Sequence, residues 1–418
     1  MSNVPKMVYA DTSGQVYDHP RLKMAVWDGH QIRLPNEDEL VPLPDGSDLF
    51  LLPQRLPLGF SGKKNHLIEY DGTDEGGSVA VSAFLAPAYL RLTHPAVRTL
   101  DKAPTLPLFA YSPVGWADGV FWTTAVRIDP ERRQDPGLFD LTKVRSGVDR
   151  DLTKMPENRL LKQLRKCALE YGCRAAQNFF LKRWECPLPT ARSCNASCLG
   201  CISWQDGEIP VTQERISFTP TAEEIAQVAG THFSRVEDAV ASFGQGCEGE
   251  PLTRPSLLVD AVKLIRKEHA KPTVNLNTNA SVPEAVEQLA LAGLSSMRVS
   301  MASPSPELYN AYHRPADYDF NDVLRSIKVA KDNGLFVSLN LLVFPGLTDR
   351  ATETDALGRL VDDFGIDMIQ WRNLNVDPEF YLDHMPGAEQ GIGILKLISD
   401  VSALHPTLKH GYFNPPTG

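Results

Sequence analysis

Strand-like and helix-like segments alternate from about residue 183 to residue 372, and this alternation limits the folds that the chain can adopt. Apolar runs at about 239–243, 273–277, 296–300, 336–343 and 368–372 predict strands, and helical spacing is found at about 255–270, 282–292, 305–333 and 352–364. Thr221-Ala-Glu-Glu224 has the form of a capping box and predicts the start of a further helix. With a strand before residue 194, the pattern gives six β/α units of about 30 residues, the size of a right-handed crossover in a parallel sheet. We therefore predict an α/β fold, a partial (β/α)6 TIM-like barrel with its chemistry at the carboxyl ends of the strands.

The remainder of the chain has other patterns. Pro and Gly are frequent up to about residue 150, between short alternating runs at 22–27, 49–52 and 79–84. These runs predict a mostly β accessory domain over residues 1–156, whose role the sequence does not indicate. Helical spacing predicts a linking helix over residues 157–182. The partial barrel then occupies residues 183–385, and a C-terminal helix and tail occupy residues 386–418.

Charge and composition disfavour some classes of partner. The 418 residues carry a net charge of −10, so the chain has no overall positive field with which to attract a long nucleic acid. No apolar run approaches the roughly 20 residues of a membrane span, and the chain does not start with an apolar signal segment. We therefore expect a cytoplasmic protein. The odd number of cysteines, 7, favours reduced thiols over a disulfide framework.

Cys194, Cys198 and Cys201 have the spacing C-x3-C-x2-C in the loop after the first predicted strand. A loop of this size can bring three thiolates to one metal centre and leave the fourth corner open. Thiolates bind zinc and iron–sulfur clusters, and a [4Fe–4S] cube with three protein ligands has one iron free to hold a small molecule. A non-catalytic electron-transfer or structural metal protein is an alternative. It would need a fourth ligand, such as Cys186 or a histidine.

The cysteine spacing, together with the motifs that follow it in order, resembles the radical SAM superfamily over roughly the last 230 residues. The resemblance implies that the three cysteines hold a [4Fe–4S] cluster whose open iron binds S-adenosyl-L-methionine (SAM). It further implies that the reduced cluster cleaves SAM to a 5′-deoxyadenosyl radical, which abstracts hydrogen from a substrate. A one-electron donor such as flavodoxin or ferredoxin would be a partner.

The segment from Phe243 to Leu252 is similar to the glycine–glutamate–proline motif of that family. The similarity implies that Gly249 lets the backbone approach the methionine end of SAM, and that Glu250 accepts hydrogen bonds from the SAM ammonium group. The sequence departs from the motif because Glu248 stands where the first of two glycines usually lies. Cys247 before it is either a packed thiol or a participant in the radical chemistry.

Three later segments are similar to other SAM-binding segments of the family. They imply that Asn277, Ser300 and Arg314 contact the cofactor, with Ser300 and the planar guanidinium of Arg314 near its carboxylate. Ser300 points into the barrel if Arg298, two residues earlier, does so or lies at its rim.

The residue before the third cysteine is usually aromatic in the family and packs on the adenine of SAM, but here it is Gly200. Adenine stacking would then fall to Trp204 or Phe344. The sequence does not decide between these two.

The sixth predicted strand ends in an unusual number of polar residues, Gln370, Arg372, Asn373 and Asn375. Buried parallel strands are nearly all apolar, so we predict that these four residues face the substrate. The alternative is that the strand end already lies in solvent.

The resemblance leaves the substrate open, whether small molecule, peptide or protein, and the catalytic residues are unknown. Radical methyl or methylthio transfer to RNA is an alternative within the same family. The acidic charge and the lack of a second C-x-x-C group count against it.

Overall fold

A computed structural model describes residues 4–61, 66–72, 76–207, 209–387 and 389–417. The chain forms two compact units, each assembled from three segments. The first unit comprises Met1–Pro130, Val343–Gly358 and Trp371–Pro406, and the second comprises Glu131–Leu342, Arg359–Gln370 and Thr407–Gly418. The two units are therefore interleaved along the sequence.

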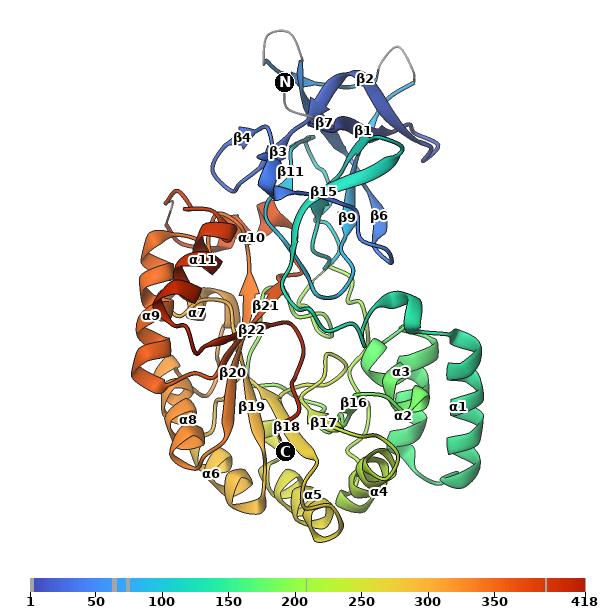
Figure 1. The fold of residues 1–418 in the computed structure, drawn as a ribbon, viewed down its shortest axis with the longest axis vertical. Helices are drawn as coiled ribbons and strands as arrows, with labels where there is room; N and C mark the ends of the chain where they lie inside the picture. The colour runs from blue at the N-terminus through green and yellow to red at the C-terminus, as the bar shows by residue number, and fades with distance from the viewer. Residues whose placement is uncertain (1–3, 62–65, 73–75, 208, 388, 418) are drawn as a thin grey trace. The chain divides into compact units, whose positions relative to one another are not determined.

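Seven strands form one sheet in the order in which they occur along the chain (Figure 1). They are β16 Glu185–Pro187, β17 Val240–Phe243, β18 Thr273–Thr278, β19 Ser296–Met301, β20 Phe336–Val343, β21 Met368–Asn373 and β22 Lys409–Gly411. The ladders that join β16 to β20 in turn are parallel, as is the ladder between β21 and β22. The predicted partial TIM-like barrel is confirmed, with β22 as a seventh strand that the sequence did not predict.

Helices follow the strands of this sheet. They are α4 Ala222–Phe233, α5 Pro255–Glu268, α6 Pro283–Ala292, α7 Pro306–His313, α8 Phe320–Asp332, α9 Ala351–Phe364, α10 Pro378–His384 and α11 Ile394–Leu404. Helix α4 packs against α5, α5 against α6, and α6 against α8, and Figure 1 shows these helices along the outside of the strands. The sheet is therefore covered on its outer face, as parallel sheets require.

The predicted capping box at the start of α4 is present. The hydroxyl of Thr221 accepts from the backbone N–H of Glu224 (3.2 Å), and the Glu224 carboxylate accepts from the backbone N–H of Thr221 (2.8 Å). The same carboxylate binds the guanidinium of Arg159 (2.7 Å) at the start of helix α2, Arg159–Leu169. The box therefore also connects α4 to the helices before the barrel.

Three helices, rather than one linking helix, precede the barrel: α1 Leu141–Lys154, α2 Arg159–Leu169 and α3 Arg174–Leu181. Helix α1 lies in the region that was predicted to be mostly β, and Asp140 caps it by accepting from the N–H groups of Thr142 and Lys143. Gly172, with a positive φ of 64°, lies between α2 and α3. Its left-handed conformation ends the helical pattern that the sequence presented as one helix.

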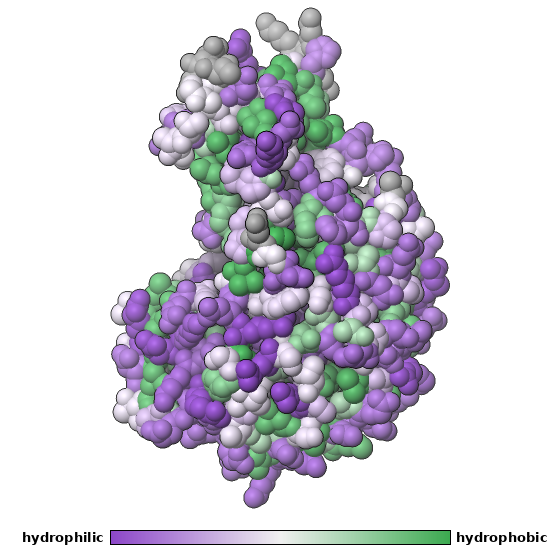
Figure 2. Space-filling model, turned by 180° about the vertical axis from the view of Figure 1, so that it is seen from behind, coloured by the Kyte–Doolittle hydropathy of each residue, from purple (hydrophilic) through white to green (hydrophobic). Residues whose placement is uncertain are grey.

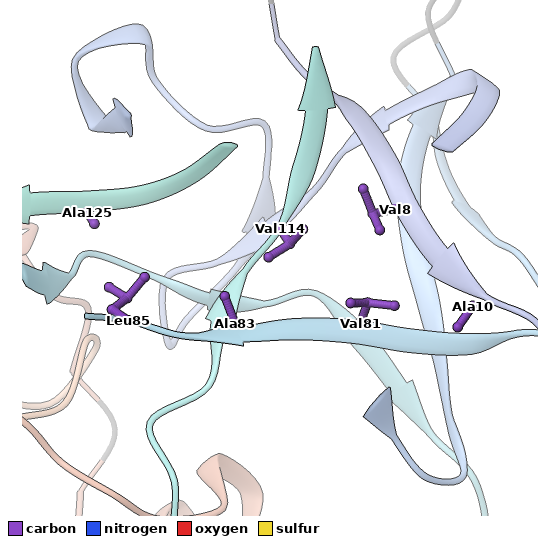
Figure 3. Close-up of a cluster of buried hydrophobic side chains, with 7 residues drawn as sticks. All are labelled: Val8, Ala10, Val81, Ala83, Leu85, Val114 and Ala125. Carbon is purple, nitrogen blue, oxygen red and sulfur yellow. The ribbon is translucent and has the colours of Figure 1, made fainter. Parts of the chain in front are cut away.

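The amino-terminal segment of the first unit, Met1–Pro130, is mostly β, as predicted. Its strands are β1 Lys6–Ala10, β2 Val16–Met24, β3 Val26–Trp27, β4 Ile32–Arg33, β5 Leu40–Pro42, β6 Asp48–Leu52, β7 Arg55–Ser61, β8 Leu67–Glu69, β9 Val79–Phe84, β10 Tyr89–Arg91, β11 His94–Pro95, β12 Val97–Thr99, β13 Ser112–Pro113, β14 Gly115–Ala117 and β15 Val120–Arg127. Most pair into a 12-stranded antiparallel sheet. Figure 3 shows one of its cores, in which Val8, Val81 and Leu85 meet Val114.

The surface mixes polar and apolar residues. Figure 2 shows hydrophobic residues (green) interspersed among hydrophilic ones (purple) on the face drawn. None of the helices in the described part of the chain has the length and hydrophobicity that a membrane span requires.

Candidate functional site

The cysteine loop follows β16 and lies at the carboxyl end of that strand. Cys194, Cys198 and Cys201 are all half-buried. The N–H of Cys201 donates to the carbonyl of Cys198 (3.1 Å), which brings the second and third cysteines together in a turn. The side-chain amide of Gln205 donates to the carbonyls of Leu199 and Cys201 and holds this turn in place.

The loop after β17 runs alongside the start of the cysteine loop. The N–H of Gly249 donates to the carbonyl of Ala191 (2.7 Å), and the N–H of Glu250 donates to the carbonyl of Ser193 (2.9 Å). A Cβ atom on Gly249 would lie 2.0 Å from the Ser193 carbonyl oxygen. Glycine is therefore required at position 249, because a residue with a Cβ atom could not bring its backbone this close to the cysteine loop.

Glu248, which departs from the family motif, joins these two loops through hydrogen bonds to its carboxylate. One carboxylate oxygen accepts from the N–H groups of Gly244 (2.7 Å) and Gln245 (2.8 Å), and the other accepts from those of Thr190 (2.6 Å) and Ala191 (2.8 Å). Burial raises the pKa of Glu248 to about 7, against the opposing effect of these hydrogen bonds. The substitution of glycine by glutamate thus gives the loop a side-chain anchor.

The C-terminal end of α7 holds the opposite side of the cysteine loop. The N–H of Leu199 donates to the carbonyl of Tyr312 (3.0 Å), and the N–H of Ser197 donates to the carbonyl of His313 (3.1 Å). Ala196 also forms a β-bridge with Pro315. Backbone hydrogen bonds from two separate elements therefore fix the path of the three cysteines.

The end of β18 contacts the loop through side chains. The amide of Asn279 donates to the side-chain oxygen of Asn195 (2.8 Å), and the amide of Asn195 donates to the hydroxyl of Ser281 (3.0 Å). Sequence reasoning did not predict these contacts, because they join residues that lie more than 80 positions apart.

The three thiols lie close enough to interact. Burial, followed by the nearby Glu250 carboxylate, raises the pKa of Cys194 to about 11. Burial, followed by the charges of Cys201 and Cys194, raises the pKa of Cys198 well above its ordinary value. A cation is needed to keep such thiolates ionised together, and metal binding supplies it.

This donor set fits an iron–sulfur cluster. The chain offers three cysteine sulfurs on one loop, each at a part-buried position, and thiolates are the ligands of such clusters. No group of three or more His, Cys, Asp or Glu side chains in the described residues is placed to hold a single metal ion.

Two donors that the sequence did not single out contact the cysteine sulfurs. The Nδ1 atom of His313 lies 3.5 Å from the sulfur of Cys198, and Nη2 of Arg215 donates to the sulfur of Cys201 (3.5 Å). Neither position has a sequence signal of its own, since each is defined by its distance to a cysteine.

Glu250 is buried at the carboxyl end of the sheet. Its carboxylate accepts from the N–H groups of Leu252 (2.9 Å) and Asn279 (2.8 Å) and from the hydroxyl of Thr278 (2.5 Å). Burial raises its pKa to about 7. These contacts orient the carboxylate beside Cys194, whose pKa it raises.

Asn277 lies in a polar network on the inner face of the sheet. Its amide donates to the carbonyl of Gly244 (3.0 Å), and its side-chain oxygen accepts from Asn275 (2.8 Å) and from Asn414 (3.3 Å). Asn414 belongs to the segment after β22, which runs back across the concave side of the sheet (Figure 1). Asn277 therefore supports the strand ends, and its proposed contact with SAM stays a prediction.

Ser300 and Arg314 occupy different environments. The guanidinium of Arg298 donates to Gln370 (3.1 Å) on the inner face, so the half-buried Ser300, two residues further on, shares that face. Arg314 ends α7 in a left-handed conformation with its side chain exposed. Its carbonyl lies 3.4 Å from the N–H of Ser197, which places its backbone beside the cysteine loop.

The four polar residues of the sixth predicted strand do not act as one group. Gln370 is fully buried and donates to Ser338 (3.2 Å) and Asn414 (3.0 Å). Asn373 accepts from the N–H of Arg91 and donates to the carbonyl of Tyr89, both at 2.9 Å, which connects β21 to β10. Both side chains thus have structural partners.

Arg372 and Asn375 are the other two residues of that group. Both side chains are half-buried. Their predicted contact with a substrate stays a prediction.

The two candidates for adenine stacking differ in exposure. Phe344 is fully buried and packs against the rings of His94 (4.4 Å between centroids) and Tyr381 (4.5 Å). Trp204 is 40% exposed, and the guanidinium of Arg215 lies 5.9 Å from its ring centroid. Exposure favours Trp204, because an adenine has no access to an enclosed ring.

Cys247 is buried, and its thiol interacts with the thiol of Cys167 in α2. This contact and burial raise the pKa of Cys247 well above its ordinary value. Gln163 donates to the same Cys167 sulfur (3.5 Å). These contacts are typical of a thiol packed in the protein interior, which is the first of the two alternatives for Cys247.

Part of the chain is similar to known proteins. Residues 188–357 match the model of the radical SAM superfamily. The chain is 26% identical over 206 residues to the GTP 3′,8-cyclase of Petrotoga mobilis, a match covering 48% of this chain and 55% of the cyclase. It is 29% identical over 158 residues to molybdenum cofactor biosynthesis protein 1 of Bos taurus, a match covering 37% of this chain and 23% of the bovine protein.

The chain thus spans about half the length of the first relative and about a quarter of the second. Among solved structures, methylornithine synthase (PylB) aligns with a TM-score of 0.39 and 15% identity, over 65% of this chain and 74% of that one. The matched segment contains the cysteine loop, the Gly249–Glu250 loop and α7. Residues 188–357 therefore form a radical SAM domain, and the enzymes of this superfamily use a [4Fe–4S] cluster and SAM.

Proposed function

We propose that Cys194, Cys198 and Cys201 hold the [4Fe–4S] cluster and that this enzyme abstracts hydrogen from its substrate. When bound, the cofactors supply one electron and a 5′-deoxyadenosyl radical derived from SAM. The chain itself holds the ligands, orients SAM and keeps water from the site.

One observation carries the proposal. The three-cysteine loop is bonded through its backbone to Gly249 and Glu250 on one side and to the end of α7 on the other. A structural metal loop has no need for a glycine–glutamate segment packed against its first cysteine. Contact between the cysteine loop and the Gly249–Glu250 segment is expected where a metal centre and the amino-acid part of SAM are bound at one site.

Electrostatics support a role for Glu250 in binding the SAM ammonium group. Its carboxylate lies near enough to Cys194 to raise the pKa of that thiol. An ammonium group placed beside Glu250 would offset this repulsion, and charge-assisted hydrogen bonds are about twice as strong as neutral ones. Ser300, Asn277 and Arg314 are proposed as further contacts from neighbouring strand and helix ends.

The polar inner face of the sheet supports a polar substrate. Arg298 and Gln370 are joined there by a hydrogen bond (3.1 Å), and Ser300 shares the same face. We propose a small polar molecule or a polar side chain of a peptide as the substrate. Flavodoxin or ferredoxin is proposed as the electron donor, and the cytoplasm, where thiols stay reduced, as the location.

The test is anaerobic reconstitution with iron and sulfide, followed by dithionite and SAM, with detection of 5′-deoxyadenosine by mass. We expect about four irons per chain from the cluster formula and product in the native protein. We expect neither in Cys198→Ala. Cys173→Ala removes a thiol outside the loop and is the matched control.

Other outcomes would favour one of the alternative functions. Iron that is bound without SAM cleavage would support an electron-transfer protein, and zinc would support a structural site. Deuterium transferred from a candidate substrate into 5′-deoxyadenosine would identify the substrate. Transfer of a methyl group to RNA would replace the proposal with the methyltransferase alternative.

A further inference from the structure

We propose that His313 and Arg215 are positioning residues that set the reduction potential of the cluster through N–H hydrogen bonds to two of its three thiolates. The inference rests on the proposed ligand set. It adds two residues, from different elements, that act on the cluster through its cysteines.

The geometry at His313 assigns its tautomer. The backbone N–H of Ala302 donates to Nε2 of His313 (3.3 Å), so Nε2 is the acceptor and carries no proton. The proton of the neutral ring therefore lies on Nδ1, which faces the sulfur of Cys198 at 3.5 Å. The ring is thus held as an N–H donor to that sulfur.

Packing fixes this orientation. His313 is 2% exposed and stacks on Tyr309, with ring centroids 4.2 Å apart and an angle of 23° between the planes. Tyr312 contacts the same ring edge-on at 4.9 Å. Because the His313 carbonyl also accepts from Ser197, the ring and the cysteine loop are held by the same residue.

Arg215 contacts the third cysteine with a permanent charge. Its Nη2 donates to the sulfur of Cys201 (3.5 Å), and its Nε donates to the hydroxyl of Ser203 (3.2 Å). The Ser203 hydroxyl in turn donates to the carbonyl of Glu248 (3.4 Å). The guanidinium is therefore anchored between the cysteine loop and the loop after β17.

These donors favour the reduced cluster. Reduction adds negative charge that spreads onto the thiolate sulfurs, and hydrogen bonds to sulfur together with nearby positive charge stabilise that charge. Loss of either donor is expected to shift the midpoint potential to more negative values. Loss of Arg215 is expected to have the larger effect, because it removes a charge as well as a hydrogen bond.

The experiment is an EPR-monitored redox titration of the reconstituted, full-length protein without SAM. We expect more negative midpoint potentials in Arg215→Gln and His313→Phe. Arg215→Lys keeps the charge, and His313→Asn keeps an N–H near the position of Nδ1, so both are expected to recover part of the shift. Arg192→Gln makes the same charge change at an exposed side chain two residues before Cys194 and is the matched control.

A second readout starts from the native protein. In protein labelled with 15N at histidine alone, pulsed EPR of the reduced cluster is expected to show a 15N coupling, which is lost in His313→Phe. An absent coupling, or equal potentials in cluster-loaded Arg215→Gln and the native protein, would overturn the inference and leave the proposed function intact. A native protein that assembles no cluster would overturn the proposed function instead.

Discussion

Gly249 and Ser193 approach so closely that a methyl group on Gly249 would lie 2.0 Å from the Ser193 carbonyl oxygen. This contact joins the loop after β17 to the residue before the first cysteine. Glu248, one position earlier, anchors the same loop through four backbone N–H groups. The motif residue that the sequence assigned to SAM binding thus also positions the cysteine loop.

Gly249→Ala is therefore expected to impair both stability and cluster assembly. The added Cβ must displace backbone at Ser193, and overpacking of this kind costs about 1–3 kcal/mol. Denaturant unfolding and iron content after reconstitution measure the two effects. Gly137→Ala, where a Cβ meets nothing within 4 Å, is the control. Normal iron content in Gly249→Ala would show that the loops adjust independently.

His232 is expected to make the stability of the second unit depend on pH. It is fully buried with Nε2 3.0 Å from the carbonyl of Trp184, and burial lowers its pKa to about 4. His232 therefore takes up its proton near pH 6.5 in the unfolded chain, but only near pH 4 in the folded chain. The contribution of neutral His232 to the free energy of unfolding, about 3 kcal/mol, is complete above pH 6.5 and is lost as the pH falls towards 4.

His232→Gln isolates this contribution, because glutamine keeps an N–H donor near Nε2 and does not titrate. The difference in unfolding free energy between the native protein and this variant is expected to change between pH 7 and pH 4.5. A constant difference across this range would show that His232 does not titrate as proposed. Other buried groups cancel in the comparison, since both proteins contain them.

The sequence predicted the strands from β17 to β21 because each is an apolar run followed by a helix of regular spacing. It did not predict β22, since Lys409–Gly411 has no strand-like pattern and becomes a strand by pairing with β21. The interleaved units were also not predictable, because linear composition does not show that Val343–Gly358 and Trp371–Pro406 pack with the first 130 residues.

Residues of the candidate site could be predicted where a local sequence pattern marks them. They could not be predicted where only the fold brings them close to a cysteine. The three cysteines and the Gly249–Glu250 segment have local signatures. His313 lies 115 positions from Cys198, and Arg215 lies 14 positions from Cys201, so their contacts exist only in the fold. The polar residues of β21 were noticed, but the structural partners of Asn373 are in a strand about 280 residues earlier.

Asn414→Ala is expected to destabilise the second unit. The Asn414 amide donates to Glu185 (2.8 Å), and its oxygen accepts from Gln370 (3.0 Å), so truncation leaves buried polar groups without partners. Such groups cost about 1–3 kcal/mol. Urea unfolding measures this, with the exposed Asn321→Ala as control. Equal losses in the two variants would argue against the importance of the network.

Arg55 and Asp377 form a buried ion pair within the first unit (3.1 Å, with side chains 4% and 3% exposed). The same Asp377 oxygen accepts from the N–H of Leu106 (2.7 Å), and the other oxygen caps α10. Arg55→Met would leave this carboxylate buried without its cation, which is expected to destabilise the unit by about 3–5 kcal/mol.

Two further variants separate charge from packing at this pair. Arg55→Met with Asp377→Asn is expected to recover part of the loss, because the amide keeps an oxygen for the capping N–H groups and has no charge to compensate. Arg98→Met breaks the exposed pair with Glu69, where 48% and 36% of the side chains are exposed, and is expected to cost much less, because water screens the two charges. Thermal unfolding compares the three variants. A double variant less stable than Arg55→Met alone would show that Asp377 acts through its hydrogen bonds rather than its charge.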